Sequence, residues 1–292
     1  MERQKIDLSH KSLLQPALKA VASQLSEYSF ANLYLFRERH DYELAKEGSE
    51  LYIVGTSYDG FCFLMPTSLK GLESILASKK LWTGIDFLFP IAEEWLGLVD
   101  LTSWQACYKA EDSDYLFDME QIASYKGRHL SKKRNLVKQL QEHYEVSHTP
   151  MEAKLREQAL QVLDLWHHHA AIENDVFGDG TNTKPCKEAL EKFAELSLEG
   201  EIYFIDNKPV GFLIGEVISP ETYVIHFSKA DVSYKGIYQY MYQSFAQKMV
   251  KRSHFLNMEQ DLGRQDLRQA KHSYQPIKMC KKLRLIPRHS IA

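Results

Sequence analysis

The sequence has no long apolar run and no paired cysteines. A membrane-spanning helix needs about 18 consecutive apolar residues, and no such stretch occurs in the chain. The N-terminus, MERQK, is not followed by the apolar core of a secretory signal peptide. The cysteines stand singly at Cys62, Cys107, Cys186 and Cys280, a spacing that fits neither a zinc site nor a disulfide framework. We therefore expect a cytoplasmic protein with free thiols and no transmembrane segment.

The overall composition is that of a soluble globular protein. Hydrophobic residues make up 44% of the chain and charged residues 26%, which argues against extended disorder. A length of 292 residues is long for one compact core. It fits two domains of about 150 residues each. We expect the N-terminal domain to cover residues 1–150 and the C-terminal domain to cover residues 151–292.

A net charge of -3 conceals two strongly basic segments. Residues 121–141 contain no acidic side chain and carry Lys126, Arg128, Lys132, Lys133, Arg134 and Lys138. Residues 264–288 contain a lone Asp266 and carry Arg264, Arg268, Lys271, Lys278, Lys281, Lys282, Arg284 and Arg288. Two such surfaces favour a polyanionic ligand such as phosphate, a lipid headgroup or RNA. The alternative is that both segments are solvated helix faces.

Hydrophobic spacing predicts the main elements of secondary structure. Helices are expected over residues 11–26, 69–78, 152–171, 186–198 and 238–249. Hairpins are expected over residues 51–64 and 202–218, and further strands over residues 82–89, 222–227 and 255–258. The two hairpins start about half a chain apart, as in a duplicated domain. In the second half, the order helix, hairpin, strand, helix, strand is that of an N-acetyltransferase-type mixed sheet.

The segment from His254 to Pro276 is where we expect chemistry. An apolar strand-like run ends there in polar and charged residues. Glu259 and Asp261 alternate and can project to one side of a strand, whereas Arg268 and Lys271 are three apart and share a helix face. Because substrates of α/β proteins usually bind where strands end, this segment predicts a site with two carboxylates and two cations.

Several blocks of the sequence carry a family resemblance. They are Ser29–Phe36, Asp114–Leu116, Lys126–Arg128, Lys132–Asn135, His226, Phe227, Lys229–Asp231, Tyr234–Gly236, Tyr238, Asn257, Glu259–Gly263, Leu267, Arg268, Lys271, Ser273, Tyr274 and Pro276. With these blocks the chain resembles the phosphatidylglycerol lysyltransferase C-terminal domain family, soluble relatives included. The last block, from Asn257 to Pro276, is the most specific.

The resemblance implies an α/β fold of two tandem GNAT-like (acyl-CoA N-acyltransferase) domains. Family members with a membrane domain move an amino acid from aminoacyl-tRNA onto a lipid hydroxyl, and more distant relatives use aminoacyl-tRNA to build peptidoglycan bridges. We therefore expect an enzyme that transfers an aminoacyl group from tRNA to an amine or hydroxyl of a lipid or small molecule. No cofactor or metal is expected. The N-terminal domain is expected to be degenerate, and the C-terminal domain to carry the active cleft.

The loop after the predicted fourth strand bears on the choice of donor. In an acetyltransferase this loop cradles the diphosphate of CoA with backbone N–H groups, which requires small residues. In the segment 231–239 only Gly236 is small enough to help in this way. Aminoacyl-tRNA is therefore favoured as the donor. The alternatives are an acyl-CoA-dependent N-acyltransferase and a non-catalytic module that binds RNA or an anionic lipid. Lys235, Gly236 and Tyr238 are candidate substrate contacts in this loop, and Lys235 is equally expected to face solvent.

Three residues are candidates for general base. His226 has a side chain that titrates near neutrality, but its apolar neighbours in the predicted strand equally suggest a structural histidine. Asp231 and Glu259 are alternative bases. As ionised carboxylates they could instead bind the α-ammonium group of the donor, and this role is favoured over proton transfer.

Four further residues complete the predicted site. Arg268 and Lys271 could hold a phosphate or stabilise an oxyanion, or they could pair with Glu259 and Asp261 in a structural network. Tyr274 could supply a proton, although packing is the usual role of a tyrosine. Asn257, at the end of the strand, is a candidate substrate-binding residue.

The basic segment near Arg128 predicts a helix with an outward phosphate-binding face. Leu130, Leu136, Val137 and Leu140 recur at helical spacing. The residues expected to contact tRNA phosphates are Lys126, Arg128, Lys132, Lys133, Arg134 and Asn135, with Lys138 on the same face.

Two other features of the sequence, a run of three histidines and a Gly- and Asn-rich segment, are not assigned to a binding or catalytic site. His167, His168 and His169 point in different directions on a helix, so we do not expect them to share a metal ion. The Gly- and Asn-rich segment 175–183 is expected to be a mobile flap.

Overall fold

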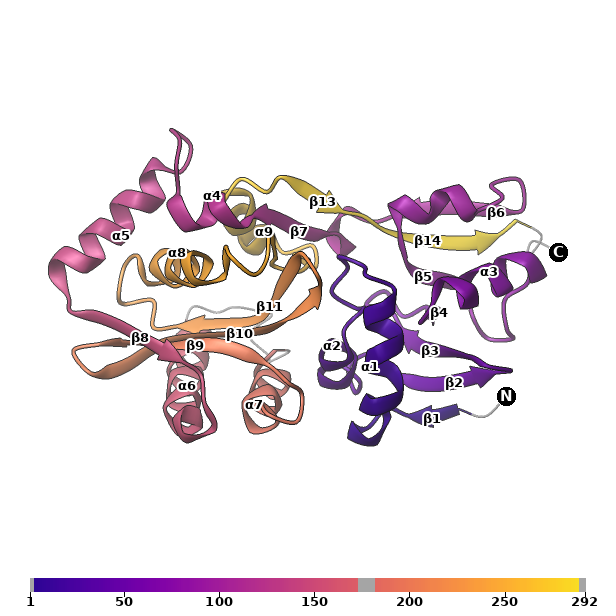
Figure 1. The fold of residues 1–292 in the computed structure, drawn as a ribbon, viewed down its shortest axis with the longest axis horizontal. Coiled ribbons are helices and arrows are strands. Elements are labelled where there is room, and N and C mark those ends of the chain that lie inside the picture. Colours follow the sequence, from indigo (N-terminus) through magenta and orange to yellow (C-terminus); the bar gives the residue numbers. More distant parts are fainter. Residues whose placement is uncertain (1–2, 173–181, 289–292) are drawn as a thin grey trace. The chain divides into compact units, whose positions relative to one another are not determined.

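The computed structural model describes residues 3–172 and 182–288 of the chain. Two seven-stranded mixed sheets form its framework (Figure 1). Sheet 1 has the order β1-β2-β3-β4-β5-β14-β6, and sheet 2 has the order β13-β7-β12-β11-β10-β9-β8. The strands of sheet 1 are β1 (Arg3–Lys5), β2 (Glu43–Glu47), β3 (Glu50–Thr56), β4 (Cys62–Pro66), β5 (Phe87–Ala92), β6 (Trp104–Tyr108) and β14 (Lys282–Pro287).

The strands of sheet 2 are β7 (Asp114–Asp118), β8 (Val146–Pro150), β9 (Glu199–Ile205), β10 (Lys208–Ser219), β11 (Thr222–Ala230), β12 (Phe255–Asn257) and β13 (Lys278–Cys280). The α-helices are α1 (Lys11–Ala20), α2 (Phe30–Leu35), α3 (Leu69–Ser78), α4 (Met119–Ser124), α5 (Ser131–His143), α6 (Arg156–Ile172), α7 (Thr183–Glu191), α8 (Ile237–Met249) and α9 (Gln265–His272). Short 3-10 helices are η1 (Leu8–His10), η2 (Glu93–Leu98), η3 (Ala110–Asp112) and η4 (Ala153–Leu155).

The two sheets repeat one topology. Each contains a run of one strand, two helices and three antiparallel strands, followed by a helix and a further strand. This last strand pairs parallel to the third of the antiparallel strands. The parallel pairs are β4 with β5 and β11 with β12, and α3 and α8 make the crossovers. This duplication confirms the predicted fold of two tandem GNAT-like domains.

The chain does not divide at residue 150. One compact unit comprises the chain up to Tyr115, Glu259–Arg268 and the chain from Met279 onward, and the other comprises Leu116–Met258 and Gln269–Lys278. Hydrogen bonding between strands explains this division, because β14 lies between β5 and β6 in sheet 1 while β7 pairs with β12 in sheet 2. The predicted boundary between residues 1–150 and 151–292 is therefore wrong, because the first segment of unit 1 already ends at residue 115. Both units are also discontinuous in the sequence.

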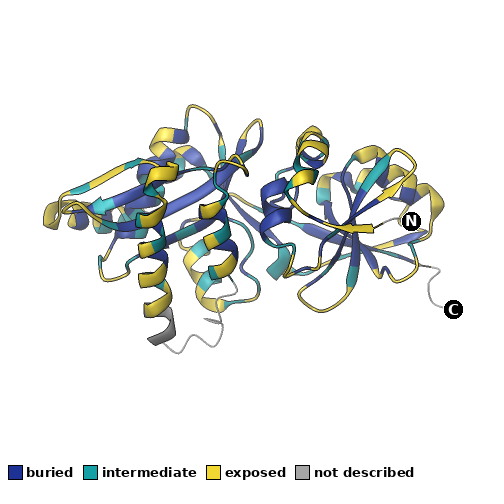
Figure 2. Ribbon diagram, turned by 90° about the horizontal axis from the view of Figure 1, so that it is seen from below, coloured by how far each residue is buried: buried dark blue, intermediate teal, exposed yellow. Residues whose placement is uncertain are grey.

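Each unit has its own apolar core (Figure 2). In unit 2, α6 and α7 cover one face of the sheet and α8 covers the other (Figure 1). Met241, Phe245 and Met249 form the buried stripe of α8, as the sequence predicted. In unit 1, α3 packs against β3 and β4 through a stripe that includes Leu72 and Ile75. The apolar periodicity thus decided which face of each helix is buried.

Several predicted bounds differ from the observed ones. The helix expected over residues 11–26 ends at Ala20, the one expected over residues 186–198 runs from Thr183 to Glu191, and the strand expected over residues 82–89 is β5. Short polar strands such as β2 and β8 were not predicted, because sequences like ELAKE and VSHTP lack an apolar run. The flap expected over residues 175–183 lies outside the described residues except for its last two positions.

None of the helices in the described part of the chain combines the length and apolar character that crossing a lipid bilayer requires.

Candidate functional site

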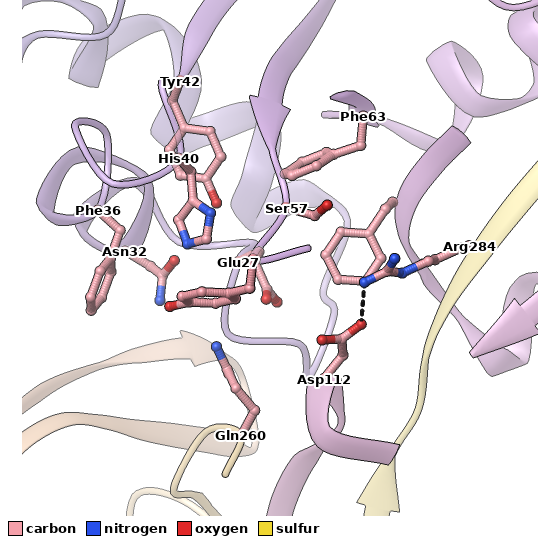
Figure 3. A pocket seen from close by; sticks show the side chains of 12 residues that line it. Glu27, Asn32, Phe36, His40, Tyr42, Ser57, Phe63, Asp112, Gln260 and Arg284 are labelled. Carbon is pink, nitrogen blue, oxygen red and sulfur yellow. Dashed lines mark hydrogen bonds and ion pairs between the residues drawn. The ribbon is translucent and has the colours of Figure 1, made fainter. Parts of the chain in front are cut away.

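A cavity in unit 1 gathers polar and aromatic side chains from distant parts of the sequence (Figure 3). Its empty space is about 500 Å³, part of it open to solvent. It is lined by Glu27, Asn32, Phe36, His40, Tyr42, Ser57, Tyr58, Phe63, Phe89, Asp112, Gln260 and Arg284. Five of these residues are Phe or Tyr and seven are polar or charged, so aromatic surface and converging polar groups line one hollow, a combination found in small-molecule sites.

A buried ion cluster forms one wall of this cavity. The Lys282 side chain is fully buried, and its Nζ lies 2.7 Å from Glu27 Oε1 and 2.6 Å from Asp114 Oδ1. Nζ also donates to Gln260 Oε1 at 3.1 Å and to Ser26 Oγ at 3.2 Å. These contacts keep the ammonium charged, and its neighbouring carboxylates raise the pKa of Lys282 despite burial.

Glu27 is the perturbed group of the cluster. Burial raises the pKa of Glu27 to about 7, Lys282 opposes the rise, and Asp114 adds to it. A carboxyl group that titrates near neutral pH can bind a cation or exchange a proton there. Glu27 was not predicted as a site residue, because a single glutamate ahead of an apolar helix carries no motif.

Arg284 forms a second cluster beside the cavity. Its Nη1 donates to Asp59 Oδ2 at 2.7 Å, and its Nη2 donates to Asp112 Oδ2 at 2.8 Å. Lys109 also binds Asp59, at 2.7 Å. The guanidinium lies over the ring of Phe87, 4.7 Å from the centroid. Lys282 and Arg284 are therefore internal, which corrects the prediction that both belong to a basic surface over residues 264–288.

His40 and Tyr58 lie together at the cavity. The Nδ1 of His40 is 2.7 Å from the carbonyl oxygen of Thr56, and its ring meets that of Tyr58 edge-on at 4.7 Å. Burial lowers the pKa of His40 to about 4, so the imidazole is neutral at physiological pH. A neutral ring that donates Nδ1–H to the Thr56 carbonyl presents Nε2 as an acceptor.

The segment after β12 belongs to unit 1, where the predicted acids Glu259 and Asp261 have different environments. Asp261 is buried and accepts hydrogen bonds from Arg268 Nε at 2.9 Å, Arg268 Nη2 at 3.1 Å and the Tyr115 hydroxyl at 2.6 Å. Burial opposes ionisation, yet these bonds hold the pKa of Asp261 below its usual value. Glu259 is partly exposed and accepts from Asn32 Nδ2 at 3.2 Å.

The predicted group of four ionisable residues is thus only partly assembled. Asp261 and Arg268 form a bidentate pair, which matches the structural alternative given for these residues. Lys271 lies on the same helix, α9, but beyond the point where the chain passes into unit 2. The pair holds the segment that carries Gln260, and Gln260 lines the cavity.

Tyr274 lies in an aromatic cluster of unit 2. It is buried, its hydroxyl accepts from Gln239 Nε2 at 3.1 Å, and its ring meets that of Tyr242 edge-on at 5.4 Å. Lys133 Nζ lies 3.7 Å from the centroid of the Tyr274 ring and donates to Ser273 Oγ at 2.6 Å. Burial raises the pKa of Tyr274 well above its usual value, which fits packing better than proton transfer.

His226 occupies a bulge in β11. Phe227 pairs with Ile214 and Ile225 pairs with Gly215, which leaves His226 as the extra residue. Its ring is buried, with Nε2 3.2 Å from Glu216 Oε1 on β10. Asn257 is fully buried at the end of β12. The structure therefore places both candidates within the interior of unit 2.

The turn after β11 is closed by its own hydrogen bonds. The Asp231 side chain accepts from the Ser233 N–H at 3.0 Å, and the Tyr238 hydroxyl accepts from the Ala230 N–H at 3.2 Å. Lys235 is exposed. Gly236 has φ +98°, and a Cβ there would lie 2.6 Å from the carbonyl oxygen of Leu136. Glycine is required at this position by backbone conformation and by packing against α5.

The basic residues around α5 have three different environments. Lys126, Arg128, Lys132 and Asn135 are exposed. Arg134 donates to the carbonyl oxygens of Tyr125 and Gly127, which ties it to the preceding turn. Lys133 is partly buried, and burial lowers its pKa to about 8. The predicted outward face is therefore supplied by the exposed residues, and Lys133 and Arg134 also make contacts within unit 2.

Comparisons with known proteins assign the family. A comparison with curated protein sequences gives no match. Among solved structures, a protein of unknown function from Bacteroides thetaiotaomicron VPI-5482 has a TM-score of 0.85 at 22% identity, covering 98% of this chain and 99% of that one. The C-terminal domain of a putative lysylphosphatidylglycerol synthetase from Agrobacterium fabrum has a TM-score of 0.65 at 12% identity, covering 96% and 92%.

L-PGS from Bacillus licheniformis has the same fold, with a TM-score of 0.58 at 12% identity, covering 85% of this chain and 89% of that one. These similarities concern the fold. The sequence profile described as "Phosphatidylglycerol lysyltransferase, C-terminal" matches residues 18–283, which include both units and nearly all the residues discussed above. The chain therefore belongs to the phosphatidylglycerol lysyltransferase C-terminal family.

Proposed function

We propose that this protein is an aminoacyltransferase that moves an aminoacyl group from aminoacyl-tRNA to an amine or hydroxyl acceptor. The family match over residues 18–283 carries the proposal, because the family is named for a lysyltransferase. The GNAT-like fold agrees with acyl transfer in general. The choice of donor depends on three features of the structure.

The first feature is the turn after β11, where a GNAT enzyme would bind the CoA diphosphate through backbone N–H groups. Here the N–H groups of Asp231 and Tyr234 donate to the carbonyl oxygens of Val210 and Asp231. The N–H of Ser233 donates to the Asp231 side chain. A carboxylate therefore occupies the position of an anion, which disfavours a diphosphate.

The second feature is the equivalent turn of unit 1, between β4 and α3. It contains only Thr67 and Ser68 before the helix begins. The Thr67 N–H donates to Leu51 O, and Ser68 Oγ accepts from the Gly71 N–H and donates to Glu50 Oε2. The Glu50 carboxylate, which also pairs with Lys70, thus takes up the Ser68 hydroxyl at this turn. Both turns thus argue for a donor other than CoA.

The third feature is the exposed basic face near α5. Lys126, Arg128 and Lys132 are exposed on a segment without acidic residues. Such a face suits a phosphate backbone and reads no base sequence. It supports tRNA as the carrier of the aminoacyl group.

In the proposed reaction, the acceptor nitrogen or oxygen attacks the ester carbonyl carbon of the aminoacyl group. The bond from this carbon to the ribose oxygen breaks, and the ribose oxygen takes up a proton. His226, Asp231 and Glu259 remain candidates for the base. Of these, Glu259 is partly exposed and close to the cavity residue Asn32, and it is the candidate we favour for contact with substrate.

The proposal is tested with tRNA charged with labelled amino acids and offered together with lipid and small-molecule extracts. We expect label to move into an acceptor, and Glu259→Gln to abolish this transfer while tRNA binding is retained. A parallel thermal melt with acetyl-CoA is the control, because a ligand raises the melting temperature only if it binds the folded state. Stabilisation by acetyl-CoA without transfer from tRNA would instead support the acyl-CoA alternative.

A further inference from the structure

We propose that the cavity of unit 1 is a binding site for a primary ammonium group. The inference deepens the proposed function and rests on it only for the biological role of the bound amine. The ammonium would be either that of the aminoacyl group or that of an amine acceptor. It also means that the N-terminal unit takes part in substrate binding and is not only a scaffold.

The charge around Glu27 is the first reason. Glu27 and Asp114 both bind the single ammonium of Lys282, at 2.7 and 2.6 Å. Two carboxylates beside one cation leave this wall of the cavity with an excess of negative charge whenever Glu27 is ionised. Burial is the main cause of the raised pKa of Glu27, Lys282 opposes the rise, and the nearby Asp114 adds to it.

The other ion cluster does not supply the missing cation. Arg284 and Lys109 both bind Asp59, and Arg284 also binds Asp112. Two cations and two carboxylates balance there. A positive group that enters the cavity is therefore attracted mainly to the Glu27 wall.

The remaining lining is suited to an ammonium group and its organic body. Figure 3 shows Glu27, Asn32, His40 and Gln260 around a common space. Neutral His40 offers an acceptor nitrogen, and side-chain amides offer acceptor oxygens. The rings of Tyr42, Tyr58 and other lining aromatics provide apolar and cation–π contacts. Because the cavity is partly open to solvent, an ammonium group can enter it while the rest of its molecule extends toward the opening.

The probes are L-leucinamide, which stands for the aminoacyl group, and n-butylamine, which stands for an amine acceptor. N-acetyl-L-leucinamide has the same body as L-leucinamide without the charge. Titration calorimetry on the whole protein should detect binding of at least one of the two amines and at least tenfold weaker binding of the acetylated compound. Preference for L-leucinamide assigns the site to the donor, and preference for n-butylamine assigns it to the acceptor.

Two variants locate the binding. Glu27→Gln keeps the shape of the side chain and should weaken amine binding at least tenfold. Tyr58→Ala removes a ring that is 45% exposed, so the fold should tolerate it, and amine binding should weaken several-fold. Glu201→Gln is the matched control, because Glu201 is a buried carboxylate paired with Lys248 in unit 2 and should not affect binding.

Absence of amine binding to the folded wild-type protein would overturn the inference, as would equal binding of the acetylated compound. Unchanged binding in Tyr58→Ala together with unchanged binding in Glu27→Gln, if that variant folds, would also overturn it. The proposed function fails in a different way. Amine binding that depends on Tyr58 and Glu27, without transfer from any charged tRNA, would retain the site and reject the aminoacyltransferase.

Discussion

Lys281 and Lys282 are neighbours in the sequence but have opposite environments. The Lys282 side chain is fully buried among Glu27, Asp114 and Gln260. Lys281 is partly exposed and pairs with Glu93 at 2.6 Å. Side chains alternate between the two faces of a sheet where β14 begins, which separates the two lysines. Only the inward lysine is expected to matter for stability.

We expect Lys282→Met to destabilise the protein by about 3–5 kcal/mol, since it leaves buried carboxylates without their cation. Lys281→Met is the control and should change stability by less than about 1 kcal/mol, as exposed ion pairs contribute little. Urea unfolding of both variants measures the difference. Equal, small effects would contradict the buried cluster.

Glu27 should also give the stability a characteristic pH dependence. Its pKa rises from 4.5 to about 7 on folding, so the folded state keeps a proton that the unfolded state releases. The contribution of Glu27 is therefore fully present below pH 4.5 and is lost as the pH rises through about 7. Compared with wild type, Glu27→Gln should lose less stability over this range in denaturant titrations.

Glu201→Gln provides the opposite sign as a control. Burial opposes ionisation of Glu201, yet His148 and Lys248 hold the pKa of Glu201 below its usual value. Its contribution is present above the pKa of the unfolded state and is lost as the pH falls. For each variant, the difference in free energy of unfolding from wild type is measured as a function of pH. If this difference changed with pH in the same direction for Glu27→Gln and Glu201→Gln, the assigned environments would be wrong.

At the scale of elements, α5 and the turn before α8 are locked together. Gly236 is the N-cap of α8, with φ +98°, directly beside the carbonyl of Leu136 on α5. Gly127, before α5, has a similar φ of +93°, but a Cβ added there would meet no atom within 4 Å. Replacing Gly127 therefore tests the cost of the left-handed backbone alone, whereas replacing Gly236 adds the cost of a steric clash.

We expect Gly127→Ala to cost about 1 kcal/mol, the strain of a left-handed conformation alone. Gly236→Ala should cost about 2 kcal/mol more, the typical magnitude of overpacking, because backbone at 2.6 Å cannot move aside cheaply. Thermal and chemical unfolding of the two variants measure this gap. Equal losses of stability in the two variants would show that the α5 backbone can shift at Leu136 to make room for the added methyl group.

The exposed basic face is the element-scale test of tRNA binding. Lys126→Glu combined with Lys132→Glu should weaken binding of bulk tRNA strongly and reduce its salt dependence, because both side chains are exposed. Lys208→Glu, at an exposed position on β10, is the matched control. Arg134 is a poor test residue, since its contacts with Tyr125 and Gly127 hold the turn in place. Unchanged tRNA binding in the double variant would reject this face.

At the scale of the whole molecule, sheet membership and chain order differ. All strands of sheet 2 lie within residues 114–280, whereas sheet 1 needs β14 from the far end of the chain. Because β14 lies between β5 and β6, its loss would divide sheet 1 and expose two strand edges. It would also remove Arg284 from the cavity lining and leave Glu27 without Lys282.

A fragment of residues 114–281 should therefore fold on its own and melt cooperatively. A fragment of residues 1–113 should not, and circular dichroism with thermal melting distinguishes the two. Joining residues 279–288, which contain β14, to the fragment of residues 1–113 through a flexible linker should restore a cooperative transition. Cooperative melting of residues 1–113 alone would contradict the central position of β14.

Much of the fold was predictable, and much of the cavity was not. Helices with a clear apolar stripe, such as α3 and α8, were predicted closely, and so were the hairpins of both units. Short strands such as the polar β2 and β8 and the three-residue β13 have no signal of their own, since hydrogen bonding to neighbours alone makes them strands. Glu27, His40 and Lys282 meet only in three dimensions, and no spacing in the sequence connects them.

The sequence by itself determined the duplicated arrangement of helices and strands and the family, because periodicity and local motifs are written within short segments. The tertiary structure alone decided that Asp261 and Arg268 neutralise each other, that Lys282 is internal, and that the cavity lies in unit 1. The physical reason is that burial and pairing of charges depend on which distant segments share a sheet. In this chain, β14 comes from the C-terminal end of the sequence and pairs within sheet 1, which brings Lys282 and Arg284 into unit 1.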